Sequence, residues 1–502
     1  MLEALLILPL LAAALMMIIT RAATGRTLLV AAAILHAVLT AAVLRRIIEG
    51  NAPSAFGGLL APDMLGGLFL GIASALFLVS SIYAVGYLKA EEGLGERAHM
   101  KTGERFTNAP ERRFTACLCI FLSAMTLVTC TRHLGALWVG IEATTLASAP
   151  LIYFHRHRES LEATWKYLII CSVGIALALI GNLLLSLAFA GNGLESANEA
   201  ADQLSVLQKL AHGVTPGDPA VPWLKAAFIF FLVGYGTKMG LAPLHNWLPD
   251  AHSQAPSLVS ALLSGALLNC ALLGILRGHQ ILLAAGLGGF SARLLLFFGL
   301  LSLITAAIFI VGQGHYKRLL AYSSVEHMGI LAFGIGLGGV AVQGAMLHAL
   351  CHSLTKCMLF LLAGNILTRY HTLSSYDVRG MRWSMPFTTV LWAGGFLAIV
   401  GSPPFGLFVS ELWIFKGALA QGQWLVGTLY LVLLAVIFVG MSVPVLRMIQ
   451  GSRPPDVPRA TREPLLSVLP PLALGLTVLL LGLYVPQGLR HVLAQAARSI
   501  GG

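Results

Sequence analysis

The sequence predicts an all-α membrane protein that crosses the bilayer many times, and three observations support this prediction. Of the 502 residues, 57% are hydrophobic and only 11% are charged, whereas a soluble protein carries about 25% charged residues. The mean hydropathy is +0.83, and apolar runs long enough to span a bilayer recur along the whole chain. This composition excludes a water-soluble globule and a disordered chain, and it leaves almost no room for a folded domain outside the membrane.

The apolar runs are the elements of this predicted fold. A membrane-spanning helix needs about 20 apolar residues, and the chain supplies about 14 runs of that kind. They lie near residues 2–20, 27–44, 63–88, 114–131, 134–154, 165–190, 222–246, 256–276, 290–313, 318–338, 341–368, 386–419, 424–446 and 464–485. The first run has no basic segment before it and no convincing cleavage site, so we interpret it as a helix and not as a signal peptide.

The distribution of basic residues predicts the orientation of the chain. Lys and Arg number 32 against 21 Asp and Glu, a net charge of +11 that would suggest a nucleic-acid partner in a soluble protein. Here about 20 basic residues fall in the odd-numbered connections between predicted helices, against about nine in the even-numbered connections and the termini. The positive-inside rule therefore places the odd-numbered connections in the cytoplasm and both termini on the opposite side of the membrane, and no nucleic acid is expected.

Cysteine usage argues against a redox or metal centre in this chain. The seven cysteines lie singly or nearly so, mostly in apolar runs. No Cys-x-x-Cys pair or Cys/His set has the spacing of a zinc or iron–sulfur site. Small apolar core residues explain the cysteines best. We therefore expect this chain to bind no cofactor and any redox centre to belong to a partner chain.

Two of the apolar runs contain helix-breaking residues. Pro243 follows a glycine inside the run 222–246, and Pro403 and Pro404 interrupt the run 386–419. Proline removes a backbone hydrogen bond, so each run is expected to form a discontinuous helix. Simple kinks absorbed by neighbouring helices are the alternative. The two breaks lie five helices apart, a pattern typical of transporters built from inverted repeats with an ion path at the breaks.

The positions of the breaks also predict how the chain is organised. Helices 4–8 and 9–13 of the predicted fold would form two inverted five-helix repeats. The two long polar connections, 89–113 and 191–220, are too short to be domains. The predicted units are an N-terminal three-helix segment with its cytoplasmic connection (1–113), a first repeat (114–276), a second repeat (277–448) and a C-terminal helix (449–502).

Charged residues inside the predicted helices are the first candidates for function, because a buried charge in hydrocarbon needs a partner or a task. Glu142 lies near the middle of the run 134–154, and Lys238 lies well inside the run 222–246. We expect the two to pair across helices and to form a proton site, since a lysine released from its carboxylate in a desolvated pocket gives up its proton readily. A static salt bridge is the alternative.

A second group of titratable residues falls in the later runs. His348, His352 and Lys356 are spaced i, i+4 and i+8, which places them on one helix face as a predicted hydrogen-bonded ladder. His327 offers a further titratable group on the preceding run, and Glu411 follows the second break. Histidines at i and i+4 could instead bind a metal, but no third ligand forms a recognisable pattern. Two histidines of one helix are also poorly placed to bind haem, whose axial ligands approach from opposite faces.

Two motifs give these residues a family context. The segment 239–256, Met-Gly-Leu-Ala-Pro-Leu-His-Asn-Trp-Leu-Pro-Asp-Ala-His-Ser-Gln-Ala-Pro, resembles the signature of the antiporter-like subunits of respiratory complex I, Mrp antiporters and membrane-bound hydrogenases. The similarity continues through the segment 318–329, Arg-Leu-Leu-Ala-Tyr-Ser-Ser-Val-Glu-His-Met-Gly. It covers most of the chain from about residue 114 to residue 416.

The resemblance implies proton translocation by specific residues. The positions that match the family's titratable residues are Glu142, Lys238, His327, His352, Lys356 and Glu411. Many members carry a lysine where this chain has Asn269. Because an asparagine cannot carry a proton, the central relay must use water or bypass this position.

Two further segments indicate a branch of the family. Residues 138–153 and 159–167 are most similar to component F of hydrogenase 4. This resemblance implies a proton-translocating inner-membrane subunit, without a redox centre of its own, of a complex that includes other membrane-arm subunits and a peripheral arm with iron–sulfur clusters and a nickel–iron site. The alternatives are an M- or N-type subunit of NADH:quinone oxidoreductase, a subunit of an Mrp-type cation/proton antiporter, and a membrane enzyme with its own metal or haem.

The orientation is directly testable with reporter fusions. A reporter fused after Gly502 is expected to be active on the periplasmic side, and one inserted in the connection 89–113 on the cytoplasmic side, because basic residues are retained in the cytoplasm. Periplasmic phosphatase and cytoplasmic fluorescence measurements on both fusions check this. The opposite pattern would contradict the topology and the even number of helices behind it.

Overall fold

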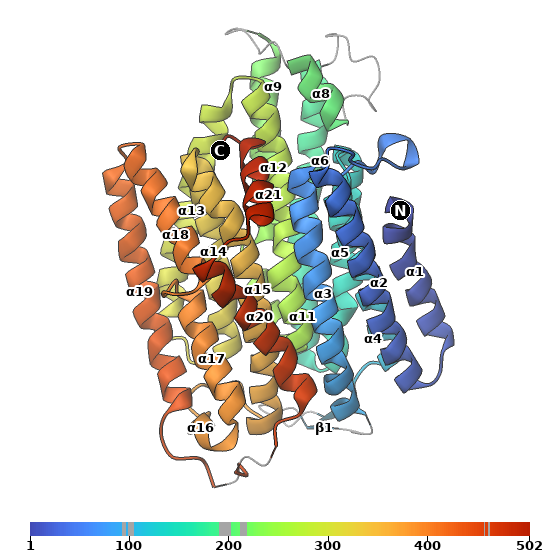
Figure 1. Cartoon of the computed structure of the whole chain (residues 1–502), viewed down its shortest axis with the longest axis vertical. Helices are drawn as coiled ribbons and strands as arrows, with labels where there is room; N and C mark the ends of the chain where they lie inside the picture. The colour runs from blue at the N-terminus through green and yellow to red at the C-terminus, as the bar shows by residue number, and fades with distance from the viewer. Residues whose placement is uncertain (93–96, 99–104, 190–201, 211–217, 456, 460–461) are drawn as a thin grey trace.

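The structure, a computed structural model, describes residues 1–92, 97–98, 105–189, 202–210, 218–455, 457–459 and 462–502. Its helices form an elongated bundle with both ends of the chain in the upper half of the view (Figure 1). Within the described residues, twelve helices are long and apolar enough to cross a membrane, and two shorter apolar helices, α1 (Leu2–Ile18) and α17 (Pro386–Ile399), accompany them. The all-α multi-pass membrane fold is confirmed, whereas the count of about 14 crossings stays a prediction.

The other helices follow the apolar runs of the sequence. In the first half they are α2 (Ala22–Ile48), α3 (Met64–Glu91), α4 (Glu111–Cys130), α5 (Leu134–Ile152), α6 (Arg158–Phe189), α8 (Gln203–Lys209), α9 (Ala220–Met239), α10 (Trp247–Gln254), α11 (Ser257–Leu262), the π-helical η4 (Leu263–Leu267) and α12 (Leu268–Ala284). In the second half they are α13 (Gly288–Ile310), α14 (Tyr316–Leu337), α15 (Val340–Tyr370), α16 (Met381–Ser384), α18 (Gly406–Ala420), α19 (Trp424–Ile449), α20 (Leu465–Leu483) and α21 (Gln487–Arg498).

The connections contain little regular structure. Two short 3₁₀ helices, η1 (Phe56–Gly58) and η2 (Tyr153–His155), lie between helices, and strands β1 (Arg97–Ala98) and β2 (Arg105–Phe106) pair in antiparallel fashion. Much of the two polar connections, 89–113 and 191–220, lies outside the described residues. The division of the chain into four units stays a prediction.

Side chains cap several helix starts. The Asp63 carboxylate accepts a hydrogen bond from the Gly66 amide at 2.9 Å, which caps α3. His133 and His315 cap α5 and α14, where each Nδ1 accepts from the backbone amide three residues later, at 3.2 and 3.3 Å. A capping side chain satisfies an amide that has no partner in the helix itself. The second helix of each predicted repeat therefore begins with the same histidine N-cap.

Both proline-containing runs are divided into two helices. The segment between α9 and α10 contains Pro243 and begins with Gly240, whose φ of 83° is left-handed. The segment between α17 and α18 likewise contains Gly401, with a φ of 65°, followed by Pro403 and Pro404. Glycine leaves the right-handed helix without a Cβ clash, and proline cannot continue the hydrogen-bond ladder. Each break therefore frees backbone polar groups inside the bundle.

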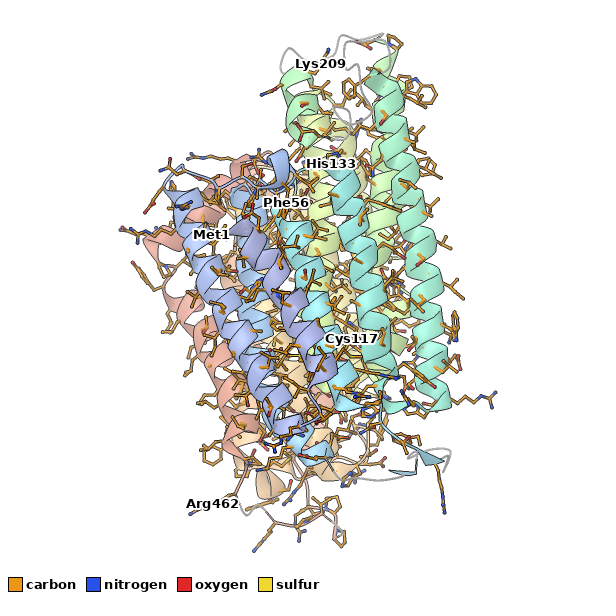
Figure 2. All side chains as sticks on the ribbon, turned by 90° about the vertical axis from the view of Figure 1, so that its right-hand side faces the viewer. Met1, Phe56, Cys117, His133, Lys209 and Arg462 are labelled. Atoms are coloured by element: carbon orange, nitrogen blue, oxygen red, sulfur yellow. The ribbon has the colours of Figure 1, made fainter. Side chains whose placement is uncertain are left out.

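Burial identifies the centre of the bundle. The most apolar stretch of the span 257–284, which joins α11, η4 and α12, is completely buried, and the corresponding stretches of α14 and α15 are 94% and 89% buried. The stretches of α2, α6 and α20 are only 33%, 33% and 28% buried. Side chains project outward along these peripheral helices (Figure 2). An apolar outer face around a more polar centre is the arrangement that suits a lipid bilayer.

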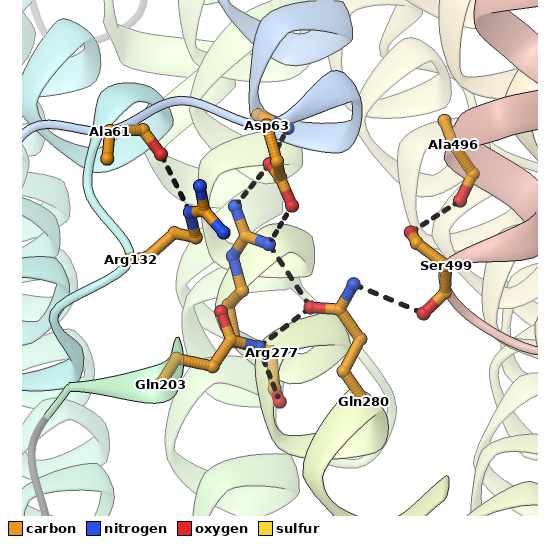
Figure 3. Close-up of polar contacts among 9 residues, drawn as sticks. Ala61, Asp63, Arg132, Gln203, Arg277, Gln280, Ala496 and Ser499 are labelled. Carbon is orange, nitrogen blue, oxygen red and sulfur yellow. Dashed lines mark hydrogen bonds and ion pairs between the residues drawn. The ribbon is translucent and has the colours of Figure 1, made fainter. Parts of the chain in front are cut away.

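A buried charged network joins distant parts of the chain (Figure 3). Arg277 of α12, which is 1% exposed, donates two hydrogen bonds to the Asp63 carboxylate, at 2.6 and 2.7 Å. The Gln280 carbonyl accepts from Arg277 at 3.1 Å and from Gln203 of α8 at 2.7 Å, and its amide donates to the Ser499 carbonyl at 3.2 Å. The network therefore connects α3, α8, α12 and the C-terminal segment.

The protonation of Asp63 sets the pH range in which this network contributes to the free energy of unfolding. Burial alone would raise the pKa of this carboxyl, but the charge and hydrogen bonds of Arg277, together with the Gly66 amide and Arg132, hold the pKa at about 2. An aspartate in an unfolded chain has a pKa of about 4. Since the folded pKa is the lower one, the contribution is fully present above about pH 4 and is lost as the pH falls through about 2.

Replacing Asp63 tests this network. Asp63→Asn leaves the buried Arg277 without a counter-charge and is expected to lower the free energy of unfolding by roughly 3 kcal/mol at pH 7. Thermal unfolding of the purified protein in detergent measures the change. Glu49→Gln removes the exposed Arg45–Glu49 pair and serves as the control that changes little. Equal stability of Asp63→Asn and the unmodified protein would show that the network is dispensable.

Candidate functional site: a buried chain of titratable groups

Lys238 is held by three helices directly before the first break. It lies in the last turn of α9, and its side chain is fully buried. Its Nζ donates hydrogen bonds to Thr145 Oγ1 of α5 at 2.8 Å and to the Tyr167 hydroxyl of α6 at 2.5 Å. The ammonium also lies 4.4 Å from the centroid of the Tyr167 ring. A buried amine with hydroxyl partners keeps a hydrogen-bonded exit for its proton.

Glu142 lies near this lysine without touching it. One carboxylate oxygen accepts from Ser172 Oγ of α6 at 2.8 Å, and the other is buried with no hydrogen-bond partner among the described residues. The predicted direct Glu142–Lys238 pair is wrong, because Lys238 instead bonds Thr145, three residues or about 4.5 Å further along α5. The Glu142 charge still acts electrostatically on Lys238. A proton must therefore cross a short gap between the two groups.

Asn269 and the π-helical segment occupy the middle of the bundle. The Asn269 amide donates to Ser353 Oγ of α15 at 2.7 Å and to the Gly265 carbonyl at 2.9 Å, and its side-chain oxygen has no partner in the described chain. Within η4, Ser264 Oγ lies 2.8 Å from Ser324 Oγ of α14. A π-helical turn widens the helix, and such turns often occur at functional sites. Here the π-helical turn lies in the span 257–284, whose side chains form hydrogen bonds to both α14 and α15.

The three histidines form a cluster across α14 and α15. His327 Nδ1 lies 2.9 Å from His348 Nε2, and His348 Nδ1 lies 2.9 Å from Ser410 Oγ of α18. The His352 ring centroid lies 4.9 Å from that of His327 and 6.4 Å from that of His348. The predicted ladder along α15 is wrong in its connections, because His348 and His352 do not bond each other. His327 of the neighbouring helix contacts both of them.

Lys356 marks one side of this cluster. Its side chain is fully buried, and its Nζ donates to the Leu320 carbonyl at 2.6 Å and to Ser323 Oγ, both on α14. The next histidine along α15, His352, has two buried ring nitrogens without a hydrogen-bond partner in the described part of the chain. Lysine, histidine and hydroxyl groups thus lie together in a region from which bulk water is excluded.

Glu411 marks the other side, at the second break. Its carboxylate is 7% exposed and lies so close to Gly401 that a Cβ there would overlap it. A carboxylate oxygen lies within 4.8 Å of ring nitrogens of His327 and His348. Two imidazoles and a carboxylate are a donor set also found in metal sites. Here the hydrogen bond between the imidazoles occupies a nitrogen on each ring, so the geometry supports a hydrogen-bonded chain.

A cavity of about 250 Å³ opens beside Glu411 between α18 and α19. Tyr430 also lines the cavity, and its hydroxyl is buried with no hydrogen-bond partner among the described residues. The other lining residues are apolar side chains and Gly401, so the Glu411 carboxylate is the main polar group beside this cavity. Glu411 therefore lies near both the histidine cluster and the cavity between α18 and α19.

Sequence reasoning missed several buried titratable residues, among them Glu326, Lys317 and His252. Glu326 precedes His327 in a motif that was recognised only for its histidine. Lys317 is 1% exposed and donates to the Ala255 carbonyl at 2.6 Å. His252 is fully buried and stacks on Phe360 with centroids 5.0 Å apart. Glu326 lies inside the predicted run 318–338, so a count of every charge within the runs was the available signal for it. Lys317 lies one residue before that run, and His252 lies in a family motif between two runs.

The arrangement of these groups defines a class of protein. Two broken helices, a polar centre and a chain of buried lysines, histidines and carboxylates are features of ion-translocating membrane proteins. A family model described as "NADH:quinone oxidoreductase/Mrp antiporter, TM" matches residues 131–438. The chain belongs to this family, and the resemblance seen in its motifs is confirmed.

Relatives with similar sequences include two bacterial proteins. The chain is 35% identical over 434 residues to the hydrogenase-4 component F homolog of Methylacidiphilum infernorum, and the aligned region covers 86% of each chain. It is 28% identical over 462 residues to NADH-quinone oxidoreductase subunit N of Desulforudis audaxviator, and the aligned region covers 88% of this chain and 85% of that one.

A solved structure shows the same fold over nearly the whole chain. It is a chain of the Mrp complex from Dietzia sp. DQ12-45-1b, with a TM-score of 0.82 and 20% sequence identity over 99% of this chain and 97% of that one. The antiporter-like fold is therefore common to this chain and to that protein.

The histidine cluster gives a test of the site. His352→Ala and Lys356→Ala are expected to leave the protein assembled in the membrane but to lower proton uptake, since both side chains are buried inside the bundle and Lys356 bonds α14 alone. Proton uptake into vesicles, with assembly checked on native gels, measures this. His491→Ala, at an exposed histidine of α21, is the matched control. Loss of either buried variant from the membrane would show that the cluster is mainly structural.

Proposed function

We propose that this protein is the proton-translocating antiporter-like subunit of a complex I-related membrane-bound hydrogenase of the hydrogenase-4 type. The observation that carries the proposal is the buried chain of titratable groups in the bundle of a family member. Similarity to a hydrogenase-4 component F homolog over 86% of both chains supports the branch. In this role the subunit couples electron transfer in partner subunits to ion movement.

The proposed setting combines the family resemblance with the distribution of basic residues. The partners would be other membrane-arm subunits and a peripheral hydrogenase or dehydrogenase arm, in a bacterial inner membrane with both termini in the periplasm. The electron-transfer groups, iron–sulfur clusters and a nickel–iron site, would belong to those partners. This chain would supply no redox chemistry, because its titratable side chains exchange only protons.

The proposed mechanism uses two groups of residues and a polar link between them. In the first half, Lys238 exchanges its proton through the hydroxyls of Thr145 and Tyr167, under the charge of Glu142. A change in the distance between the carboxylate and the lysine alters the proton affinity of the amine. Because both lie in a region of low dielectric, a small movement has a large electrostatic effect.

The second group continues the chain. Lys356 can exchange a proton with the histidine cluster, which ends beside Glu411 at the second break. Asn269 holds no proton, but its side chain donates a hydrogen bond to Ser353, the residue that follows His352 in α15. Water bound at the free Asn269 oxygen would complete the link between the two halves. The broken helices provide the flexible points at which the chain can open and close.

An M- or N-type subunit of NADH:quinone oxidoreductase is the second candidate. The 28% identity to a subunit N over most of both chains favours it. Purification of the complex through this subunit separates the two proposals. Hydrogen evolution by the purified complex supports the hydrogenase assignment, whereas NADH-dependent quinone reduction without hydrogen evolution would replace it.

The first half of the chain gives the sharpest test of proton translocation. Glu142→Gln keeps the size of the side chain but removes its charge, and Lys238→Met removes the amine. Each is expected to lower proton uptake on the order of tenfold or more, and the double variant is expected to be little worse than either, because both act on one unit. Proton uptake into vesicles driven by the partner enzyme is the measurement.

Two exposed residues provide the controls for this experiment. Glu3→Gln and Lys416→Met change the same residue types at exposed positions on α1 and α18, and both are expected to pump normally. Assembly of each variant is checked on native gels. Normal pumping by an assembled Glu142→Gln complex would reduce Glu142 to a structural role, and normal pumping by Lys238→Met would remove the basis of the proposed function.

A further inference from the structure

Glu326 is a buried carboxylate of α14 that has no role in the chain of residues described so far. It is 1% exposed, and its Oε2 has no hydrogen-bond partner among the described residues. Removing a carboxylate from water without bonding partners is strongly unfavourable. Buried charged groups also contribute little net stability even when they are paired. Stability therefore gives no reason for a glutamate at this position.

The surroundings of Glu326 connect the two ends of the second group. Ser323, one turn earlier on α14, accepts a hydrogen bond from Lys356, and His327, the next residue, belongs to the histidine cluster. Residues three apart on a helix are surface neighbours, so Glu326 lies beside the end of the Lys356 side chain. Its charge acts on Lys356 and also on Glu411. Glu326 therefore lies within electrostatic range of both groups, and the next residue, His327, lies near the Glu411 carboxylate.

Glu326 also has a counterpart in the first half of the molecule. α5 and α14 are each the second helix of a predicted repeat, and each begins with a histidine cap. Each carries a carboxylate, half-buried Glu142 or fully buried Glu326, with one buried oxygen that has no hydrogen-bond partner among the described residues. Each carboxylate acts electrostatically on a lysine of another helix, Lys238 or Lys356, without forming an ion pair. The two halves thus repeat one combination of groups.

We propose that Glu326 is a proton-holding residue that receives the proton from Lys356 and delivers it to Glu411. In the first step an N–H bond of the Lys356 ammonium breaks and an O–H bond forms on Glu326, which leaves a neutral amine and a carboxylic acid. In the second step this proton passes to the Glu411 carboxylate, and Glu326 is ionised again. Only a proton moves, so the step needs no further reactant.

This proposal rests on the proposed function, and Glu326→Gln tests it. The variant keeps the volume of the side chain but cannot hold the proton, so an assembled complex is expected to lose proton uptake on the order of tenfold or more. Glu162→Gln, at a carboxylate with 62% of its side chain exposed on α6, is the matched control and is expected to pump normally. Normal pumping by assembled Glu326→Gln overturns the proposal.

Infrared difference spectra supply a readout besides activity. They compare the assembled complex at rest with the same complex while its partner enzyme drives it. A carboxylic-acid carbonyl band is expected in the unmodified complex, absent in Glu326→Gln and shifted in Glu326→Asp. If Glu326→Gln fails to assemble, the Glu326→Asp spectrum decides, because a band that does not shift overturns the proposal.

The result for Lys238→Met separates this proposal from the proposed function. Loss of pumping by Lys238→Met together with normal pumping by Glu326→Gln rejects the role of Glu326 alone. Normal pumping by both rejects the proton-holding role together with the proposed function.

Discussion

The fold depends on one constraint, which is that no charged or backbone polar group can face hydrocarbon without a partner. Apolar helices satisfy the constraint at the periphery, where α2, α6 and α20 contact their surroundings. The buried centre meets it differently, because Lys238 and Lys356 are held by hydroxyl and carbonyl groups and not by ion pairs. Amines held in this way stay separate from the nearby carboxylates, and that separation is what allows a proton to be exchanged.

The two helix breaks connect this constraint to function. Lys238 lies directly before the first break, and Glu411 lies against Gly401 at the second. Between them, the π-helical segment and Asn269 bring one central span into hydrogen-bond contact with both α14 and α15. Each departure from a regular α-helix in the buried centre therefore coincides with a titratable side chain or with a polar link between two of them.

The sequence predicts the fold well and the site in part. Apolar runs and prolines predict helices and breaks, because both effects are local. The Glu142–Lys238 contact and the His348–His352 ladder were wrong, since a helix wheel gives the face of a residue but not the distance across an interface. Lys238 bonds Thr145, and His348 bonds His327. In both cases the partner lies on another helix, and the sequence does not give that pairing. The sequence predicts Glu411 as a titratable residue, but not its surroundings. Its carboxylate lies against Gly401, and this contact forms only when the second break is folded.

The central claim is that a continuous polar path joins the two halves of the bundle, although Asn269 cannot carry a proton. Several buried atoms lack partners within the described chain, among them the Asn269 oxygen, one Glu142 oxygen and both His352 ring nitrogens. A cryo-electron-microscopy map of the assembled complex, at a resolution that shows ordered water, tests the claim most directly. The account predicts water molecules bound to these atoms in a chain from Lys238 to Lys356. A dry, apolar gap around Asn269 would contradict it.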